Sequence, residues 1–171
     1  MRTPWLAGLF LAFATPSAAA EARLADRMVA RVNGEPILLS ELRTRIRPEL
    51  ARHAADPAWS RVAWLRTALR AAREDAIVER LVAERAARLR IEVSDAEVDR
   101  ALDSIARERK LDRAELLQLA LEQGYSEPVY RRALRAQLLE YGVMRADGSS
   151  SRPSFISELR RRACVESFGR L

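Results

Sequence analysis

Two short apolar runs near the start of the sequence are separated by Asn33-Gly34. Val29, Ala30 and Val32 precede this pair, and Ile37, Leu38 and Leu39 follow it. Asn-Gly is a strong signal for a two-residue hairpin turn, because both turn positions need a positive φ. The pattern predicts an antiparallel hairpin in which Val32 pairs with Glu35 and Arg31 pairs with Pro36. Because proline has no N–H, the second strand is expected at the edge of the sheet.

The free side of the first strand needs another partner, and the best candidate is the strand-like run 163–168 at the far end of the chain. We therefore expect a three-stranded sheet with the first strand in the middle, which joins the two ends of the domain. The single cysteine, Cys164, lies in this last run and is expected to be a small buried apolar side chain.

Between the strands, apolar residues recur at helical spacing. Ser40 is expected to cap a short helix that begins at Glu41 and is bent or ended by Pro48. Asp56 and Pro57 together predict the start of a long helix over 59–90, because aspartate is a favoured cap and proline suits the first helical position.

Three further helix starts share one device, a capping residue just before the first turn. Ser94 with Glu97 and Asp112 with Glu115 form capping boxes by spacing, and Ser126 precedes Glu127-Pro128. These signals predict helices over 95–108, 113–123 and 127–145, with Gly124 ending the middle one. A linker at 146–152 and a short basic helix at 153–162 follow. The predicted buried faces comprise Val98, Leu102 and Ile105, and Tyr130, Leu134, Leu138 and Tyr141.

The predicted fold class is mainly α: an orthogonal helical array with a small antiparallel sheet, formed by the N-terminal hairpin and the C-terminal strand. One domain is expected over 21–171. Residues 1–20 indicate a signal peptide, because Arg2 precedes an apolar run that is too short to span a bilayer and small residues follow Pro16. Cleavage is expected after Ala20, which would give an exported, periplasmic protein.

The chain has 171 residues, with 30 Lys and Arg, 24 Asp and Glu, and a formal net charge of +6. A basic chain of this kind raises nucleic-acid binding as one alternative. The acidic residues are interleaved with the arginines, as on solvated helix faces with i,i+4 pairs. Together with the export signal, this interleaving argues against a nucleic-acid partner.

Candidate chemistry is sparse. His53 and Cys164 are the single histidine and the single cysteine, and neither has a catalytic motif around it. Asp95, Glu97, Asp99 and Asp103 form an acidic cluster, but a position in the first turns of a helix accounts for it better than a metal does. No phosphate-binding glycine loop is present in the sequence. We therefore expect no catalytic residue, no metal and no cofactor.

The order of these elements resembles the N-terminal chaperone module of SurA-type periplasmic chaperones and related parvulin-type foldases. The matching features are the export signal, the hairpin with its Val-Ala-Arg-Val-Asn-Gly-Glu-Pro-Ile sequence, the run 76–98, the helices that end near Met144, and the closing segment 158–166. The resemblance covers nearly the whole chain after the signal peptide.

Members of that family usually carry one or more parvulin prolyl-isomerase domains before the returning C-terminal segment. Only residues 146–152 stand at that place here, and a parvulin site needs paired histidines, whereas this chain has one. The resemblance therefore implies an ATP-independent holdase for unfolded or nascent outer-membrane or secreted proteins, without isomerase activity.

A holdase needs exposed apolar or aromatic side chains in a groove with a polar rim. The candidate peptide-binding residues are Trp59, Trp64, Tyr130, Tyr141 and Met144, each of which could instead belong to the core. An alternative function is that of a dedicated assembly partner of one exported protein. Exchange of terminal elements between two copies would also permit a homodimer.

Overall fold

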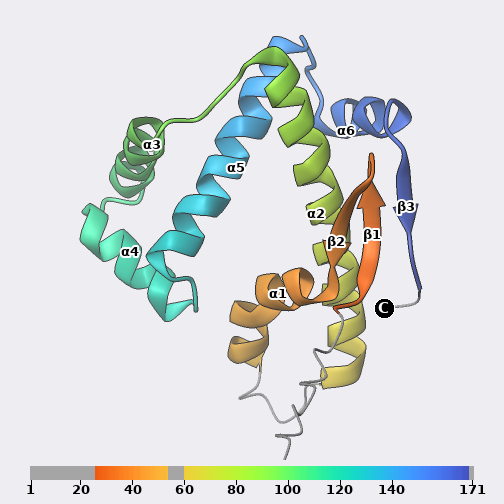
Figure 1. Ribbon diagram of the computed structural model, residues 1–171. Coiled ribbons are helices and arrows are strands. Elements are labelled where there is room, and N and C mark those ends of the chain that lie inside the picture. Colours follow the sequence, from red (N-terminus) through yellow and green to blue (C-terminus); the bar gives the residue numbers. More distant parts are fainter. Residues whose placement is uncertain (1–25, 54–59, 170–171) are drawn as a thin grey trace, which may run out of the picture.

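The computed structural model describes residues 26–53 and 60–169. Within these ranges the elements are β1 (Met28–Val32), β2 (Glu35–Leu38), α1 (Leu39–His53), α2 (Arg61–Leu89), α3 (Asp95–Glu108), α4 (Arg113–Glu122), α5 (Glu127–Ala146), α6 (Arg152–Arg161) and β3 (Val165–Ser167). The helices α2 and α5 meet near their C-terminal ends and diverge from there (Figure 1). The predicted mainly α fold with a small terminal sheet is confirmed.

The hairpin has the predicted register and turn. Val32 lies opposite Glu35, and Arg31 lies opposite Pro36. Asn33 and Gly34 have φ values of 48° and 93°, as a type I′ turn requires. The strand order β2-β1-β3 places β1 in the middle and the proline-bearing strand at one edge.

The C-terminal strand β3 pairs antiparallel with β1, with Glu166 opposite Arg31. Their side chains form an ion pair of 2.7 Å across the two strands. The expectation that Cys164 is buried is wrong, because its side chain is exposed. Residues alternate between the two faces of a strand, so Val165 packs against the core while Cys164 and Glu166 share the other face.

Asn33 ties the hairpin turn to two other parts of the chain. Its Nδ2 donates to Glu84 Oε2 of α2 at 2.6 Å, and its Oδ1 accepts from the Cys164 N–H at 2.8 Å. We expect Asn33→Ala to lower the free energy of unfolding by about 2 kcal/mol, because both side-chain bonds are lost and alanine tolerates a positive φ poorly.

The matched variant Asn33→Gly removes the same two bonds but keeps the backbone conformation accessible. Its expected loss is about 1 kcal/mol, measured for both variants by urea unfolding followed by circular dichroism. Equal losses for the two variants would show that the positive φ contributes nothing.

Helix α1 differs from its predicted start and end. It begins at Leu39, so Ser40 lies inside the first turn and is not the cap. Asp26 supplies the cap instead: its Oδ1 accepts the Ser40 N–H at 3.2 Å, and this pairing, led by the Ser40 hydroxyl, lowers the pKa of Asp26. The helix is not ended by Pro48 but continues through it to His53.

The other helix boundaries follow the predictions within two residues. The boxes at Ser94 with Glu97 and Asp112 with Glu115 are both formed, whereas Ser126 precedes α5 without a side-chain capping bond. Gly124 has a φ of 85° after α4, and the Tyr125 N–H bonds the Ala120 carbonyl oxygen at 2.9 Å. The predicted cap at Asp56-Pro57 lies outside the described residues, and α2 begins at Arg61.

Two hydrophobic cores lie on opposite parts of the fold. The first joins the sheet, α1, α2, α6 and the C-terminal part of α5, and the second joins α3, α4 and the N-terminal part of α5. Tyr141 was predicted on a buried face, but it is 60% exposed. None of the helices in the described ranges has a stretch apolar and long enough to cross a bilayer.

Candidate functional site: a groove between three helices

A groove of about 550 Å³ lies between α1, α2 and α5. Its floor consists of small or aliphatic side chains, namely Ile46, Ala68, Ala71, Ala72, Val78, Val82, Ala83, Ala133, Ala136 and Leu139. Along α2 the lining runs from Ala68 to Ala83, about 22 Å at 1.5 Å per residue. An extended segment of about seven residues matches this length.

The groove stays open because alanines occupy the positions where the two long helices face each other. Where helices pack closely, large side chains interlock and fill the space between them. Here α2 and α5 diverge, and Ala71 and Ala133 each present only a methyl group to the gap. The result is an apolar surface that a side chain from another molecule can fill.

Arginines and carboxylates form the rim, and two pairs of them, Arg45 with Glu79 and Arg152 with Glu140, hold each other in place. Both Nη atoms of Arg45 donate to Glu79 at 2.7 Å, and Nη2 also donates to Glu41 at 2.8 Å. These bonds, foremost those to Glu79, raise the pKa of Arg45 above its ordinary value. Across the groove, Arg152 pairs with Glu140 of α5, with Nη2 3.1 Å from Oε2.

Asp75 of α2 lines the same groove. Partial burial raises its pKa, and the negative charge of Glu79 adds to the effect, while Arg152 and Arg45 oppose it. Because Asp75 lies in the lining, its carboxylate places a hydrogen-bond acceptor beside the apolar floor. A bound main chain could donate N–H groups to such an acceptor.

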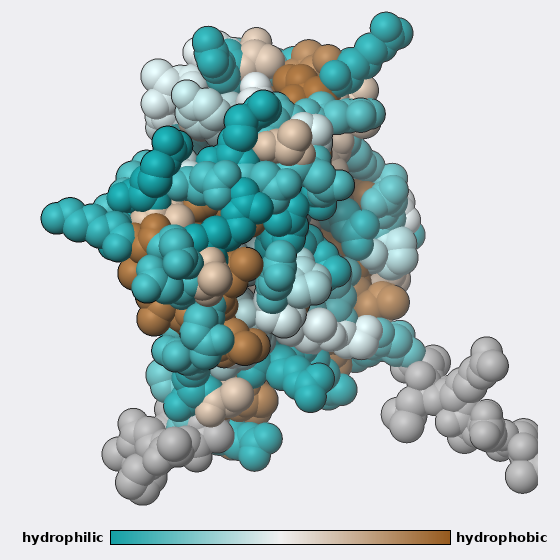
Figure 2. Space-filling view, turned by 90° about the vertical axis from the view of Figure 1, so that its left-hand side faces the viewer, coloured by the Kyte–Doolittle hydropathy of each residue, from teal (hydrophilic) through white to brown (hydrophobic). Residues whose placement is uncertain are grey.

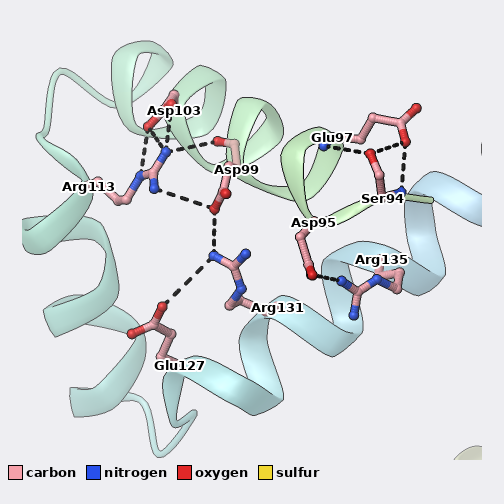
Figure 3. Close-up of polar contacts among 9 residues, drawn as sticks. All are labelled: Ser94, Asp95, Glu97, Asp99, Asp103, Arg113, Glu127, Arg131 and Arg135. Carbon is pink, nitrogen blue, oxygen red and sulfur yellow. Dashed lines mark hydrogen bonds and ion pairs between the residues drawn. The ribbon is translucent and has the colours of Figure 1, made fainter.

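Helix α5 forms one side of the groove and is held in place by a series of ion pairs. We call this series the α3–α5 ladder (Figure 3). Three aspartates four residues apart on α3 face arginines: Asp95 contacts Arg135, Asp99 contacts Arg131, and Asp103 contacts Arg113. Arg131 Nη1 lies 2.7 Å from Asp99 Oδ1. Arg113 of α4 holds Asp103 through two bonds of 2.8 and 2.7 Å.

The acidic cluster on α3 thus serves the fold. Glu97 belongs to the capping box, and the three aspartates pair with arginines. Arg135 contributes both to the ladder and to the lining of the groove. Among residues 26–53 and 60–169, no three His, Cys, Asp or Glu side chains are placed to hold a metal ion together.

The ladder predicts an acid-sensitive contribution to stability. The hydrogen bond from Arg131, followed by the charges of Arg131 and Arg113, lowers the pKa of Asp99. A carboxylate with a lowered pKa in the folded state stabilises the fold at neutral pH, and this contribution is lost as the pH falls from about 4 through the lowered value. We call the decrease in the free energy of unfolding below about pH 4 the acid limb. We expect Asp99→Asn to make this decrease smaller, measured by urea unfolding at a series of pH values.

Glu92→Gln is the matched control, because it removes an exposed carboxylate from the segment just before α3. This variant should keep the acid limb of the unmodified protein. An equal flattening in both variants would mean that general charge repulsion, and not the ladder, sets the acid sensitivity.

The residues predicted for peptide binding are dispersed. Trp59 lies outside the described residues. Trp64 is half-buried against the first core, with its ring centroid 5.5 Å from that of His53, and Met144 packs against the same core. Tyr130 packs against the second core, and Tyr141 is exposed on α5. The four described candidates do not line the groove.

The sequence analysis expected a groove with aromatic side chains and did not identify these lining residues, many of which are alanines. A usable signal existed: Ala68, Ala71 and Ala72 recur on one face of α2 at helical spacing, and Ala133 and Ala136 do so on α5. Alanine at such positions usually indicates close packing between helices. The divergence of α2 from α5, a property of the whole fold, turns these positions into a cavity floor.

The outer face of the α3–α4–α5 lobe is mostly hydrophilic, with apolar side chains gathered in a few patches (Figure 2). The large exposed apolar residues of this lobe are Leu119, Leu121, Val129 and Tyr141. The groove and this surface can therefore bind apolar and polar groups of another molecule.

Comparisons with known proteins agree on one family. The profile of the SurA-like N-terminal domain matches residues 3–144. The chain is 33% identical over 136 residues to the protein named Chaperone SurA from Ralstonia nicotianae, covering 80% of this chain and 27% of the relative. It is 32% identical over 129 residues to Chaperone SurA from Shewanella oneidensis, covering 75% of this chain and 29% of the relative. The aligned region thus spans less than a third of these curated relatives.

Proposed function

Because the chain belongs to the SurA-like N-terminal domain family, we propose that it is a chaperone that holds unfolded exported polypeptides in the groove between α1, α2 and α5. The single observation that carries the proposal is the combination of an apolar floor with a fixed charged rim. Apolar side chains of an unfolded segment would contact the alanines, and its main chain would bond the rim.

The groove suits reversible holding because its floor is made of small side chains. Burying about 100 Å² of apolar surface contributes about 2.5 kcal/mol, so a few client side chains give useful but reversible affinity. No bond is made or broken, and neither ATP nor a metal has a role in the proposal. We propose no isomerase activity. At the place where family members usually carry isomerase domains, α5 leads into α6 through residues 147–151 alone.

The aromatic candidates remain part of the proposal as an outer surface. Tyr141 follows Glu140, which lines the groove, and its exposed ring offers an apolar face and a hydroxyl to a client that leaves the groove. Trp64, Tyr130 and Met144 pack against the two cores and would need local rearrangement or a longer client to take part. Trp59 stays a candidate outside the described residues.

We further propose that the protein acts in the periplasm after cleavage behind Ala20. This localisation is tested by expressing the protein with residues 1–20 and recovering it from the periplasm by osmotic shock. Mass spectrometry should then give a chain that begins at Glu21. A chain that keeps residues 1–20 and stays with the membrane fraction would contradict the proposed cleavage.

The holdase activity is tested by light scattering of a urea-unfolded outer-membrane protein after dilution, with the exported protein present. Suppression at near-stoichiometric ratio is expected, and it should be the same with and without ATP. Unchanged aggregation in the presence of a sample that is folded by circular dichroism would contradict a general holdase.

A dedicated partner protein is the second candidate, favoured by the fixed ion pairs on the rim. Arg45 and Arg152 are each held by carboxylates, so the rim presents a defined charge pattern. Such a pattern can select one client through charge complementarity. Tight binding of one exported protein together with no effect on generic unfolded chains would favour this function.

Sedimentation analysis of the same sample would test the proposed dimer formed by exchange of terminal elements.

A further inference from the structure

The two hydrophobic cores stand on opposite sides of the groove and share one helix. The C-terminal part of α5, with Val143, packs in the first core, and the N-terminal part, with Leu134, packs in the second. The cores are also connected by residues 90–94, at the end where α2 and α5 meet. At this end the two lobes are joined through the chain itself and through buried side chains.

At the opposite end of the groove, α1 meets the turn between α4 and α5 in a small contact. A Cβ atom on Gly124 would lie 3.3 Å from Cα and Cβ of Pro48, so the two backbones touch where no side chain intervenes. Next to this contact, the Arg52 guanidinium lies 5.9 Å from the centre of the Tyr125 ring. We call these four residues the α1–turn contact.

The α1–turn contact is much weaker than the joined end. A cation–π pair at an exposed site contributes about 0.5–1 kcal/mol. Pro48 lacks the N–H that would bond the Thr44 carbonyl, so α1 is also less firmly held at this position. A rigid lobe attached at one end and held lightly at the other has the form of a hinged unit.

We propose that the α1–turn contact is a latch: when it parts, the α3–α4 lobe swings away from α1 about the joined end, and the groove widens. The ladder keeps α3, α4 and the N-terminal part of α5 together as one moving body. Resting on the proposed function, the latch would admit a client segment between α1 and α5 and close behind it.

Two glycines give a matched test of the latch. Gly124 and Gly148 both follow a helix with positive φ, 85° and 67°, so alanine strains both backbones in the same way. At Gly148 an added Cβ meets nothing within 4 Å, whereas at Gly124 it meets Pro48. Only Gly124→Ala should push the latch open.

The measurement is the distance between spin labels at Arg43→Cys on α1 and Ala114→Cys on α4, by pulsed electron paramagnetic resonance in a Cys164→Ser background. All four positions can carry such changes because Arg43, Ala114 and Cys164 are exposed and Gly124 lies in a surface turn. Gly124→Ala should shift the distance distribution to longer values, and Gly148→Ala should leave it unchanged. Arg52→Ala should give a partial shift, and Tyr125→Phe, which keeps the ring, should give none.

Identical distributions for Gly124→Ala and Gly148→Ala, together with no shift in Arg52→Ala, would overturn the latch. The measurement needs no client, so its result is separate from that of the aggregation assay. With an unfolded outer-membrane protein added, faster binding by Gly124→Ala is expected. Unchanged binding rates in a variant whose labels have moved apart would overturn the role of the latch in admitting clients.

Discussion

Replacing Ala71 by tryptophan is expected to weaken the binding of an unfolded outer-membrane segment at least tenfold, equivalent to about 1.4 kcal/mol. Ala71 is exposed on α2 and lines the groove, so an indole ring fits there without entering the core and occupies the space that a client would fill. The measurement is fluorescence anisotropy of a labelled segment, with aggregation suppression as a second readout. Ala133→Trp, which fills the groove from α5, should have the same effect.

Ala87→Trp is the control, because Ala87 is also exposed on α2 but lies outside the groove lining. It should bind the segment as tightly as the unmodified protein. If Ala71→Trp and Ala133→Trp both bind like the control, the groove is not the binding site. The exposed surface around Tyr141 would then be the next region to map.

Phe155→Ala is expected to lower the free energy of unfolding by about 3–5 kcal/mol. Phe155 of α6 is 2% exposed and is one of the largest fully buried side chains. It packs in the first core, so its loss leaves a cavity and weakens the docking of α6, which carries β3 to the sheet. Since small domains have about 5–15 kcal/mol of stability, urea unfolding should show a large decrease in the midpoint.

Phe168→Ala tests whether the loss of stability in Phe155→Ala comes from the burial of the side chain and not from the aromatic ring as such. Phe168 is half-buried after β3, with the Arg31 guanidinium 6.0 Å from its ring centre. About 1 kcal/mol of loss is expected there. Equal losses in the two variants would contradict the docking of α6 through Phe155.

Local chemistry explains why much of the fold was predictable. The hairpin register follows from Asn33-Gly34, where only a turn with two positive φ values fits. The capping boxes of α3 and α4 follow from residues three positions apart. The family resemblance drawn from the order of these elements is confirmed by the match over residues 3–144.

Properties that depend on distant segments were not predictable in this way. The cap of α1 comes from Asp26, fourteen residues before the Ser40 that it contacts, because the sheet brings the two together. Helical periodicity placed Tyr141 with the buried residues of α5, yet the two cores cover different parts of that helix and leave its ring exposed. The groove likewise depends on how α2 and α5 diverge.

The central position of β1 has a consequence for how the chain acquires its structure during synthesis. β2 follows β1 directly, whereas β3 is supplied from the other end, with Arg31 and Glu166 separated by 135 positions. A nascent chain that emerges with its N-terminus first therefore exposes one side of β1 until residues 165–167 have been made. Contacts of such high sequence separation form slowly. Completion of the sheet is expected to be a late folding step, so stalled chains that lack β3 should be degraded more readily than chains that contain it.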